Sequence, residues 1–152
     1  MSHGRPSPRV EDFRFHREIE VRFRDLDPMR HVNNAVYVTY FEIARTGYMK
    51  ALGLPFEGDG IGLFPFIMLD VHCWFVAPAL FTDVIVAYVR TSSIGTKSYA
   101  FEYILTRKED GAVVAIGSST QVHYDYRQER TVPVPLELRE RLELFEGRSL
   151  SR

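Results

Sequence analysis

The residues best suited to chemistry lie in one short stretch, residues 21–37, which reads VRFRDLDPMRHVNNAVY. Asp25 and Asp27 supply two carboxylates, and His31 adds an imidazole four residues after the second carboxylate. Such groups act as nucleophiles and as general acids or bases, so the stretch is a candidate active site. Asp-Pro pairs also occur in ordinary turns, and His31 could simply hydrogen-bond the backbone, so a structural interpretation stays open.

The two aspartates are expected to differ in role. Asp25 is the better candidate for a residue that hydrogen-bonds the loop, and Asp27 for the residue that acts. In an extended stretch, side chains two residues apart face the same way, so mutual repulsion could raise the pKa of one of them.

The same stretch leads into the longest helical pattern of the chain, residues 34–52. Asn33 or Asn34 is a suitable N-cap, no proline interrupts the pattern, and Gly53 supplies a stop. The first N–H groups of a helix lack partners and carry partial positive charge, so they can polarise a carbonyl or hold an anion. We therefore expect the backbone amide of Asn34 to bind an oxyanion.

This pattern of residues resembles that of the hotdog-fold thioesterases of the 4-hydroxybenzoyl-CoA and acyl-ACP thioesterase type. The resemblance rests on Asp25-Leu26-Asp27, His31-Val32-Asn33-Asn34, Tyr37, Phe75-Val76-Ala77-Pro78 and Lys97-Ser98-Tyr99, and it extends to about Tyr124. It covers most of the chain, and its motifs are more specific for the superfamily than for a substrate.

The resemblance implies a hotdog fold and hydrolysis of an acyl-CoA thioester to a free acid and CoA. Asp27 matches the catalytic aspartate of the bacterial enzymes, and His31 would support it. Plant acyl-ACP enzymes have a catalytic asparagine where Met29 stands here, so their mechanism fits less well. Lys97 matches a lysine that binds a phosphate of CoA. Further substrate-binding candidates are Tyr37, Ser92 and Ser93.

Two alternatives stay open. One is a non-catalytic hotdog protein that binds acyl thioesters, and the other is a hotdog dehydratase acting on hydroxyacyl thioesters. The retained Asp27 argues against the first. A hotdog dehydratase typically pairs a histidine and a carboxylate across subunits, in motifs that are not found in this sequence. No cofactor is expected beyond the coenzyme A of the substrate.

Other reactive side chains have simpler interpretations. Asp70, His72 and Trp74 share one face of a predicted strand, but this set lacks the third ligand of a zinc site, so we expect no metal. Cys73 lies on the opposite face without a nearby base, which indicates a buried thiol.

Composition predicts one globular domain. The chain has 152 residues, of which 45% are hydrophobic, and a formal net charge of −1. We expect the domain to span residues 13–146, with flexible termini at 1–12 and 147–152. The charge balance gives no reason to expect binding to nucleic acid or membrane.

Cellular location is inferred from small signals. Cys73 is the single cysteine, which fits a reducing compartment. Residues 1–9 lack the apolar core of a secretory signal, and the apolar run 61–69 is too short to cross a bilayer. We expect a cytoplasmic protein.

Periodicity predicts an α+β fold in which an antiparallel sheet packs around the helix. The expected strands are residues 15–23, 63–77, 83–91, 97–107 and 112–124, separated by a loop at 55–62, a turn at 92–96 and a hairpin at 109–111. A short helix is expected from Pro135, its first helical residue, until Gly147 ends it. Several strands carry apolar residues on more than one face, so we expect a homodimer or homotetramer.

Overall fold

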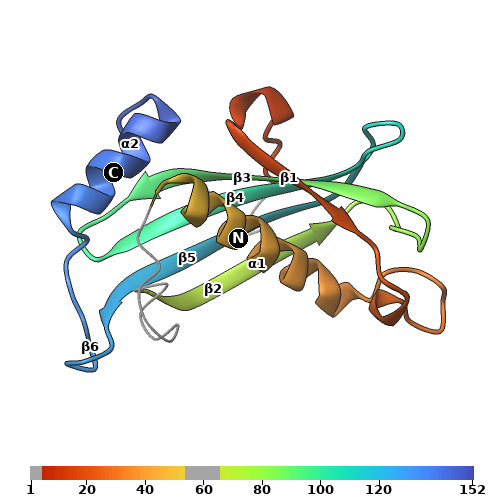
Figure 1. Ribbon diagram of the computed structural model, residues 1–152, viewed down its shortest axis with the longest axis horizontal. Coiled ribbons are helices and arrows are strands. Elements are labelled where there is room, and N and C mark those ends of the chain that lie inside the picture. Colours follow the sequence, from red (N-terminus) through yellow and green to blue (C-terminus); the bar gives the residue numbers. More distant parts are fainter. Residues whose placement is uncertain (1–4, 54–65) are drawn as a thin grey trace.

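The computed structural model describes residues 5–53 and 66–152. Two 3₁₀ turns, two α-helices and six strands follow one another along this part of the chain (Figure 1). They are η1 (Val10–Asp12), β1 (Phe15–Glu20), η2 (Phe23–Asp25), α1 (Asn34–Ala51), β2 (Phe66–Phe75), β3 (Val84–Ile94), β4 (Ser98–Arg107), β5 (Val113–Asp125), β6 (Arg130–Thr131) and α2 (Leu136–Glu146). The expected loop at 55–62 lies outside the described residues.

The sheet is antiparallel, with the strand order β1-β3-β4-β5-β2 and the short β6 beside β5. Helix α1 runs across one face of the sheet, and α2 lies at the end where β3 passes into β4 (Figure 1). This confirms the predicted hotdog arrangement of five long strands around one long helix. Strand β2 is at an edge, since its only strand partner in the described chain is β5.

The core forms where aromatic side chains of β4 meet those of α1. Tyr99, Phe101 and Tyr103 alternate along β4 and are fully buried. The ring of Phe41 stacks on that of Tyr103, with 4.6 Å between centroids. Gly117 on β5 makes this packing possible, because a Cβ there would collide with the Phe41 ring.

Two expected strand ends are wrong by three residues, and the strand expected to end at residue 77 ends at Phe75. The first strand ends at Glu20 instead of Phe23, whose side chain is 80% exposed in the turn η2. Ser92 and Ser93 belong to β3 and not to a turn, because a register shift between Thr91 and Ser93 absorbs the extra residue.

The two predicted helices are found at nearly their expected positions. Helix α1 ends one residue before Leu52, and Asn33 is its N-cap. Pro135 is the N-cap of α2 and not its first helical residue. Gly147 ends α2 with a left-handed φ of 68°, as its position after the apolar pattern predicted.

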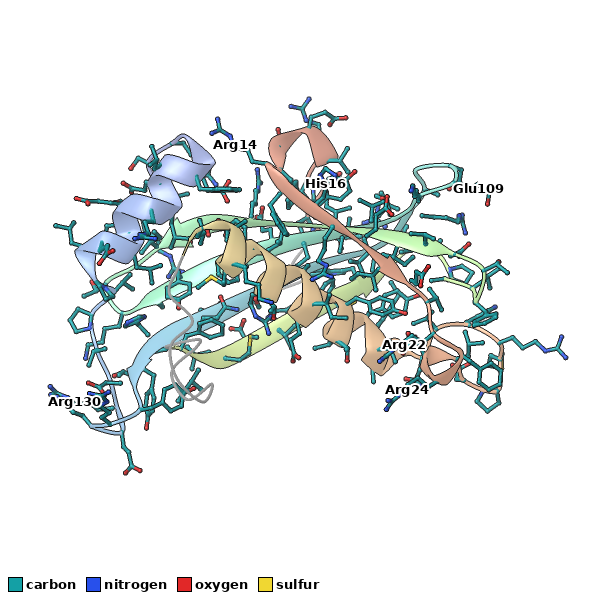
Figure 2. The ribbon with its side chains drawn as sticks, viewed as in Figure 1. Arg14, His16, Arg22, Arg24, Glu109 and Arg130 are labelled. Atoms are coloured by element: carbon teal, nitrogen blue, oxygen red, sulfur yellow. The ribbon has the colours of Figure 1, made fainter. Side chains whose placement is uncertain are left out.

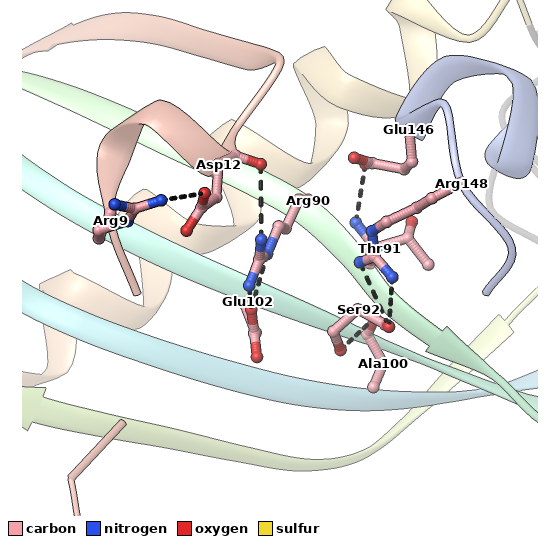
Figure 3. A network of polar contacts seen from close by, with 9 residues as sticks. All are labelled: Arg9, Asp12, Arg90, Thr91, Ser92, Ala100, Glu102, Glu146 and Arg148. Carbon is pink, nitrogen blue, oxygen red and sulfur yellow. Dashed lines mark hydrogen bonds and ion pairs between the residues drawn. The ribbon is translucent and has the colours of Figure 1, made fainter. Parts of the chain in front are cut away.

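The expected flexible tail at 147–152 is corrected by the structure. Leu150 is only 1% exposed, and its carbonyl accepts a hydrogen bond of 2.7 Å from Ile94 N–H. Ser151 forms an isolated parallel bridge with Ile94, and Arg148 donates to the carbonyls of Thr91 and Ser92 (Figure 3). The tail is held because Leu150 completes the core at this end of the sheet.

The arm before β1 is partly held as well. Residues 5–12 contain the turn η1, in which Arg9 and Asp12 form an ion pair of 3.3 Å. The Asp12 carbonyl accepts a hydrogen bond of 3.5 Å from Arg90, which also pairs with Glu102 (Figure 3).

In the described chain, neither helix is long and apolar enough to cross a membrane.

The contact between Gly117 and Phe41 gives a stability prediction. Gly117→Ala should lower the free energy of unfolding by about 1–3 kcal/mol, because the added methyl group overpacks a buried aromatic stack. Urea unfolding followed by circular dichroism measures the effect. Ser118→Ala, the next residue on the opposite face of β5, is the control and should change stability by less than about 0.5 kcal/mol. Equal stability of both variants would contradict the proposed packing role.

Candidate functional site

The loop between β1 and α1 is a tight hairpin whose two arms are bonded to each other. Leu26 and Val32 form an antiparallel bridge, and Asp27 N–H donates to the His31 carbonyl at 2.9 Å. Val32 N–H also donates to the carbonyl of Ala79, at 2.8 Å. The loop is therefore fixed both to itself and to the chain that precedes β3.

Asp25 anchors this hairpin to the rest of the molecule. Its carboxylate is 1% exposed and accepts hydrogen bonds from the backbone and guanidinium of Arg22 and from the Tyr40 hydroxyl, at 2.8 to 3.3 Å. Figure 2 shows Arg22 beside the turn η2. Burial alone would raise the pKa of Asp25, but the hydrogen bonds from Arg22 and Tyr40 outweigh it and lower the pKa. Asp25 is therefore a structural carboxylate, as expected, and the idea that repulsion raises its pKa is wrong.

Asp27 is half-buried and keeps part of its carboxylate available. Its Oδ1 accepts a hydrogen bond of 2.8 Å from Met29 N–H, whereas Oδ2 has no partner among the described residues. Its carbonyl accepts from Arg30 N–H at 2.9 Å, and Arg30 has a left-handed φ of 65°. Such a backbone costs a non-glycine residue roughly 1–2 kcal/mol, so the tight hairpin holds a strained residue three positions after Asp27.

The start of α1 presents one unpaired backbone donor. The Asn33 side chain caps the helix by accepting a hydrogen bond of 2.9 Å from Ala35 N–H. The Asn33 carbonyl accepts from Val36 N–H, while Asn34 N–H has no acceptor in the described chain. A free N–H at the positive end of an 18-residue helix is suited to an anionic oxygen.

The structure places His31 and Tyr37 in different surroundings. The His31 side chain is exposed and makes no hydrogen bond with the described residues. Tyr37 is buried, and its hydroxyl accepts a hydrogen bond of 3.3 Å from Ala79 N–H. Burial raises the pKa of Tyr37 despite that bond. The Tyr37 hydroxyl therefore supports the chain before β3 instead of facing an open site.

The other predicted substrate-binding residues lie at the far end of the sheet. Lys97 is exposed in the turn between β3 and β4, one full strand length away from the loop that holds Asp27 (Figure 1). Eleven residues of β3 span roughly 33 Å. Ser92 donates to the Ala100 carbonyl, and Ser93 accepts from Arg152, so both hydroxyls already have partners. A single chain does not bring these residues to Asp27.

Asp70 and His72 lie on the face of β2 opposite that of Cys73, as their spacing predicted. Asp70 and His72 lie 3.9 Å apart on the exposed face, and His72 stacks on Trp74. Across the residues that the structure describes, no three His, Cys, Asp or Glu side chains are grouped to hold a metal ion. Cys73 is half-buried on the helix side of the sheet, and burial raises the pKa of its thiol to about 11. A thiol of this kind is a poor nucleophile at neutral pH.

Two features of the site were not predicted from sequence. Tyr40 supplies a buried hydroxyl to Asp25, although its position in the apolar stripe indicated only packing. Arg45 lies on the buried side of α1, where it donates to the Tyr103 hydroxyl at 3.1 Å. The signal for Arg45 was present, because an arginine inside an apolar helical pattern needs a partner.

Comparison with known proteins assigns the family. The model of the thioesterase-like superfamily matches residues 21–142, which include the hairpin, α1, strands β2 to β6 and the first part of α2. The chain belongs to the thioesterase-like superfamily. The resemblance seen in the motif around Asp27 is thereby confirmed at the level of the family.

Relatives in the thioesterase-like superfamily include enzymes with a named activity. The chain is 28% identical over 126 residues to the long-chain acyl-CoA thioesterase FadM of Escherichia coli, which covers 83% of this chain and 95% of FadM. A thioesterase of Thermus thermophilus, solved with coenzyme A and zinc, is 34% identical. Its TM-score is 0.81, over 92% of this chain and 99% of that one. The PA5185 protein of Pseudomonas aeruginosa is 27% identical, with a TM-score of 0.78, over 97% of this chain and 100% of that one.

The lowered pKa of Asp25 gives a pH-dependent prediction. A carboxylate whose pKa falls on folding stabilises the protein above its unfolded pKa, near 4, and that contribution is lost as the pH falls toward the folded value. Asp25→Asn should therefore lower the free energy of unfolding by about 2 kcal/mol at pH 7 and by progressively less below pH 4.

Urea unfolding of the wild type and of Asp25→Asn tests this pH dependence. The measurements run from pH 7 down to the lowest pH at which the wild type is still folded. Glu109→Gln, an exposed residue of the β4–β5 hairpin, is the matched control (Figure 2). A difference between wild type and Asp25→Asn that stays constant with pH would show that the charge of Asp25 is not what stabilises the loop.

Proposed function

We propose that this protein hydrolyses an acyl-CoA thioester to a free carboxylic acid and CoA. The observation that carries the proposal is a half-buried Asp27 in a hydrogen-bonded hairpin that leads directly into α1. Among the described residues, one carboxylate oxygen of Asp27 and the N–H of Asn34 have no partner. FadM is named as an acyl-CoA thioesterase, and the Thermus thermophilus relative was solved with coenzyme A. Both relatives support CoA as the carrier.

Asp27 and Asn34 would divide the reaction between them. The Asp27 carboxylate would either attack the thioester carbonyl carbon, giving an acyl anhydride that water then opens, or remove a proton from the attacking water. In both routes the carbon–sulfur bond breaks and CoA leaves as a thiolate that takes up a proton. Asn34 N–H, at the positive end of α1, would stabilise the oxyanion that forms on the carbonyl oxygen.

We further propose that the active unit is at least a homodimer with a site shared between subunits. Strand β2 is an edge of the sheet, and it exposes four apolar side chains, Ile67, Leu69, Val71 and Phe75. Such an edge favours continuation of the sheet into a second copy across a two-fold axis. An axis of this kind reverses the direction of the partner, so the turn that carries its Lys97 would come to the end that carries Asp27.

His31 keeps the proposed role of orienting the thioester or Asp27, because its exposed side chain is free to do so among the described residues. Neither a non-catalytic binding function nor dehydration is favoured by a specific observation. The cytoplasmic location and the lack of a metal or further cofactor remain predictions.

The first functional prediction concerns Asp27. Asp27→Asn should lower kcat for acyl-CoA hydrolysis by about 10²–10⁴-fold or more, because it removes the proposed nucleophile or base. The thermal midpoint and the oligomer size should stay unchanged, because the substitution affects only the hydrogen bond from Met29 N–H to Asp27 Oδ1. Release of the CoA thiol, followed with a chromogenic disulfide, measures the rate.

The matched control is Asp70→Asn, an exposed aspartate on the other face of the sheet, which should keep wild-type turnover. If Asp27→Asn were as active as Asp70→Asn, the chemistry would lie elsewhere. A wild-type protein that binds acyl-CoA without releasing thiol would instead support the non-catalytic alternative.

The second functional prediction concerns Lys97 and the shared site. Lys97→Ala should raise KM for acyl-CoA with little change in kcat, and it should affect an acyl-pantetheine much less, because a remote phosphate contact contributes ground-state binding. Equal effects on both substrates would mean that Lys97 does not contact the nucleotide.

Mixed assemblies of Asp27→Asn and Lys97→Ala subunits test sharing directly. If one site uses Asp27 of one chain and Lys97 of the other, each mixed dimer contains one intact site and recovers activity at low substrate concentration. Each chain having its own complete site would give no recovery. A fully active monomer at high dilution, seen by sedimentation, would also contradict the shared site.

A further inference from the structure

A second group of polar side chains lies buried between α1 and the sheet, away from Asp27. Arg45 of α1 is 9% exposed, and its Nη1 donates to the Tyr103 hydroxyl at 3.1 Å. That hydroxyl is 2.7 Å from Ser119 Oγ on β5. Gln121 Nε2 donates to Ser119 Oγ and, at 3.4 Å, to the sulfur of Met68. The chain of hydrogen bonds therefore runs from the helix through β4 to β5 and β2.

Three polar atoms beside this chain have no partner in the described structure. They are Tyr99 Oη, Gln121 Oε1 and His123 Nδ1. Tyr99 and Gln121 are fully buried, and His123 is 6% exposed, so bulk water does not satisfy them. Nearly all buried polar groups in folded proteins have a partner, so these three atoms are open to a partner from outside the described residues.

Arg45 also lacks a counter-charge. Among the described residues it forms no ion pair, and its guanidinium faces the Tyr103 hydroxyl and the Phe66 ring, with 5.9 Å to the ring centroid. A buried cation without an anion is unfavourable, and arginine has five N–H groups of which only one is used here. Glu42 lies one turn earlier on α1, but its side chain is exposed and does not pair with Arg45.

A cavity opens directly beside Arg45. Its volume is ≈ 200 Å³, and it is lined by Glu42, Arg45, Thr46 and Phe66. Pockets that enclose a whole drug-sized molecule measure roughly 300–1,000 Å³, so this cavity has room for the end of a ligand and not for all of it. We name it the Arg45 pocket.

We propose that the Arg45 pocket binds a carboxylate at the distal end of the acyl chain, so that the substrates are thioesters of dicarboxylic acids. This inference rests on the proposed hydrolysis of acyl-CoA. Arg45 lines the pocket, and its free N–H groups are donors suited to a carboxylate. The Tyr99 hydroxyl is not among the lining residues, but it is a further donor without a described partner beside the same polar cluster. Rotating the Gln121 amide by half a turn would offer Nε2 as a third donor and leave Oε1 for the Ser119 hydroxyl.

The length of the preferred acyl chain depends on the distance between Asn34 and Arg45. Arg45 is eleven residues along α1 from Asn34, which corresponds to about 16 Å of helix. A site completed by a second subunit would give a different distance. The substrate series should therefore vary the number of methylene groups between the thioester and the distal carboxylate.

The experiment compares succinyl-, adipoyl- and sebacoyl-CoA with butyryl-, hexanoyl- and decanoyl-CoA, using kcat/KM of the wild-type protein. At the best length the dicarboxylic substrate should exceed its monocarboxylic match by roughly 10–100-fold, the range for a buried hydrogen bond to a charged group. Arg45→Met should abolish this preference, and Tyr99→Phe should reduce it severalfold. Tyr99→Phe removes a hydroxyl that has no partner among the described residues, so the variant should fold normally.

Arg24→Met is the control, because Arg24 is exposed in the turn η2 (Figure 2) and should leave the preference unchanged. Equal kcat/KM for the two series in wild type overturns the inference and leaves the hydrolase function intact. An Arg45→Met variant that keeps the preference but dissociates more readily overturns it as well, since the missing anion would then belong to a second copy of the chain.

The absence of turnover with every substrate would contradict the proposed function and not the pocket. In that case, titration calorimetry measures whether free adipate binds to the wild type and to Arg45→Met. Binding by wild type that Arg45→Met abolishes supports a carboxylate site, and no binding by wild type overturns it.

Discussion

One buried carboxylate holds the candidate site in place. Asp25 accepts hydrogen bonds from Arg22, which precedes the hairpin, and from Tyr40, in the second turn of α1. Its backbone carbonyl accepts from Asn33 N–H at 2.8 Å, so the two arms of the hairpin and the helix meet at one residue. The positions of Asp27 and of the first N–H groups of α1 both depend on this junction. The loop is consequently fixed to the helix that follows it, and a preorganised site requires such fixed positions.

The parts of the structure that local patterns determine were predictable. The spacing of apolar residues, a capping asparagine and Gly53 located α1 to within a residue at either end. Alternation located most strands, and the hairpin at Glu109–Gly111 followed from its turn residues, with Gly111 at a φ of 74°. The expectation that Asp25 hydrogen-bonds the loop is also confirmed, by its bonds to Arg22 and Tyr40.

Features that depend on contacts between distant residues were not predictable. The tail 147–152 has a polar composition, and only its packing against Ile94 shows why Leu150 is held. Lys97 matches a motif residue, yet its distance from Asp27 within the chain depends on the strand order. Arg45 and Gln121 lie 76 positions apart, so nothing in either local sequence indicates that they share one polar cluster with Tyr103 and Ser119.

The docked tail has a practical consequence for handling the protein. Arg152 lies against Ser93, and its N–H donates to the Ile94 carbonyl at 3.3 Å, so any residues fused after Arg152 begin at the β3–β4 end of the sheet. An affinity tag placed there would sit near Lys97 and compete with the seating of Leu150. A tag ahead of Arg5 would instead extend from the arm before β1, whose Asp12 carbonyl accepts a hydrogen bond from Arg90. The position of an affinity tag should therefore be chosen before the activity of Lys97 variants is compared.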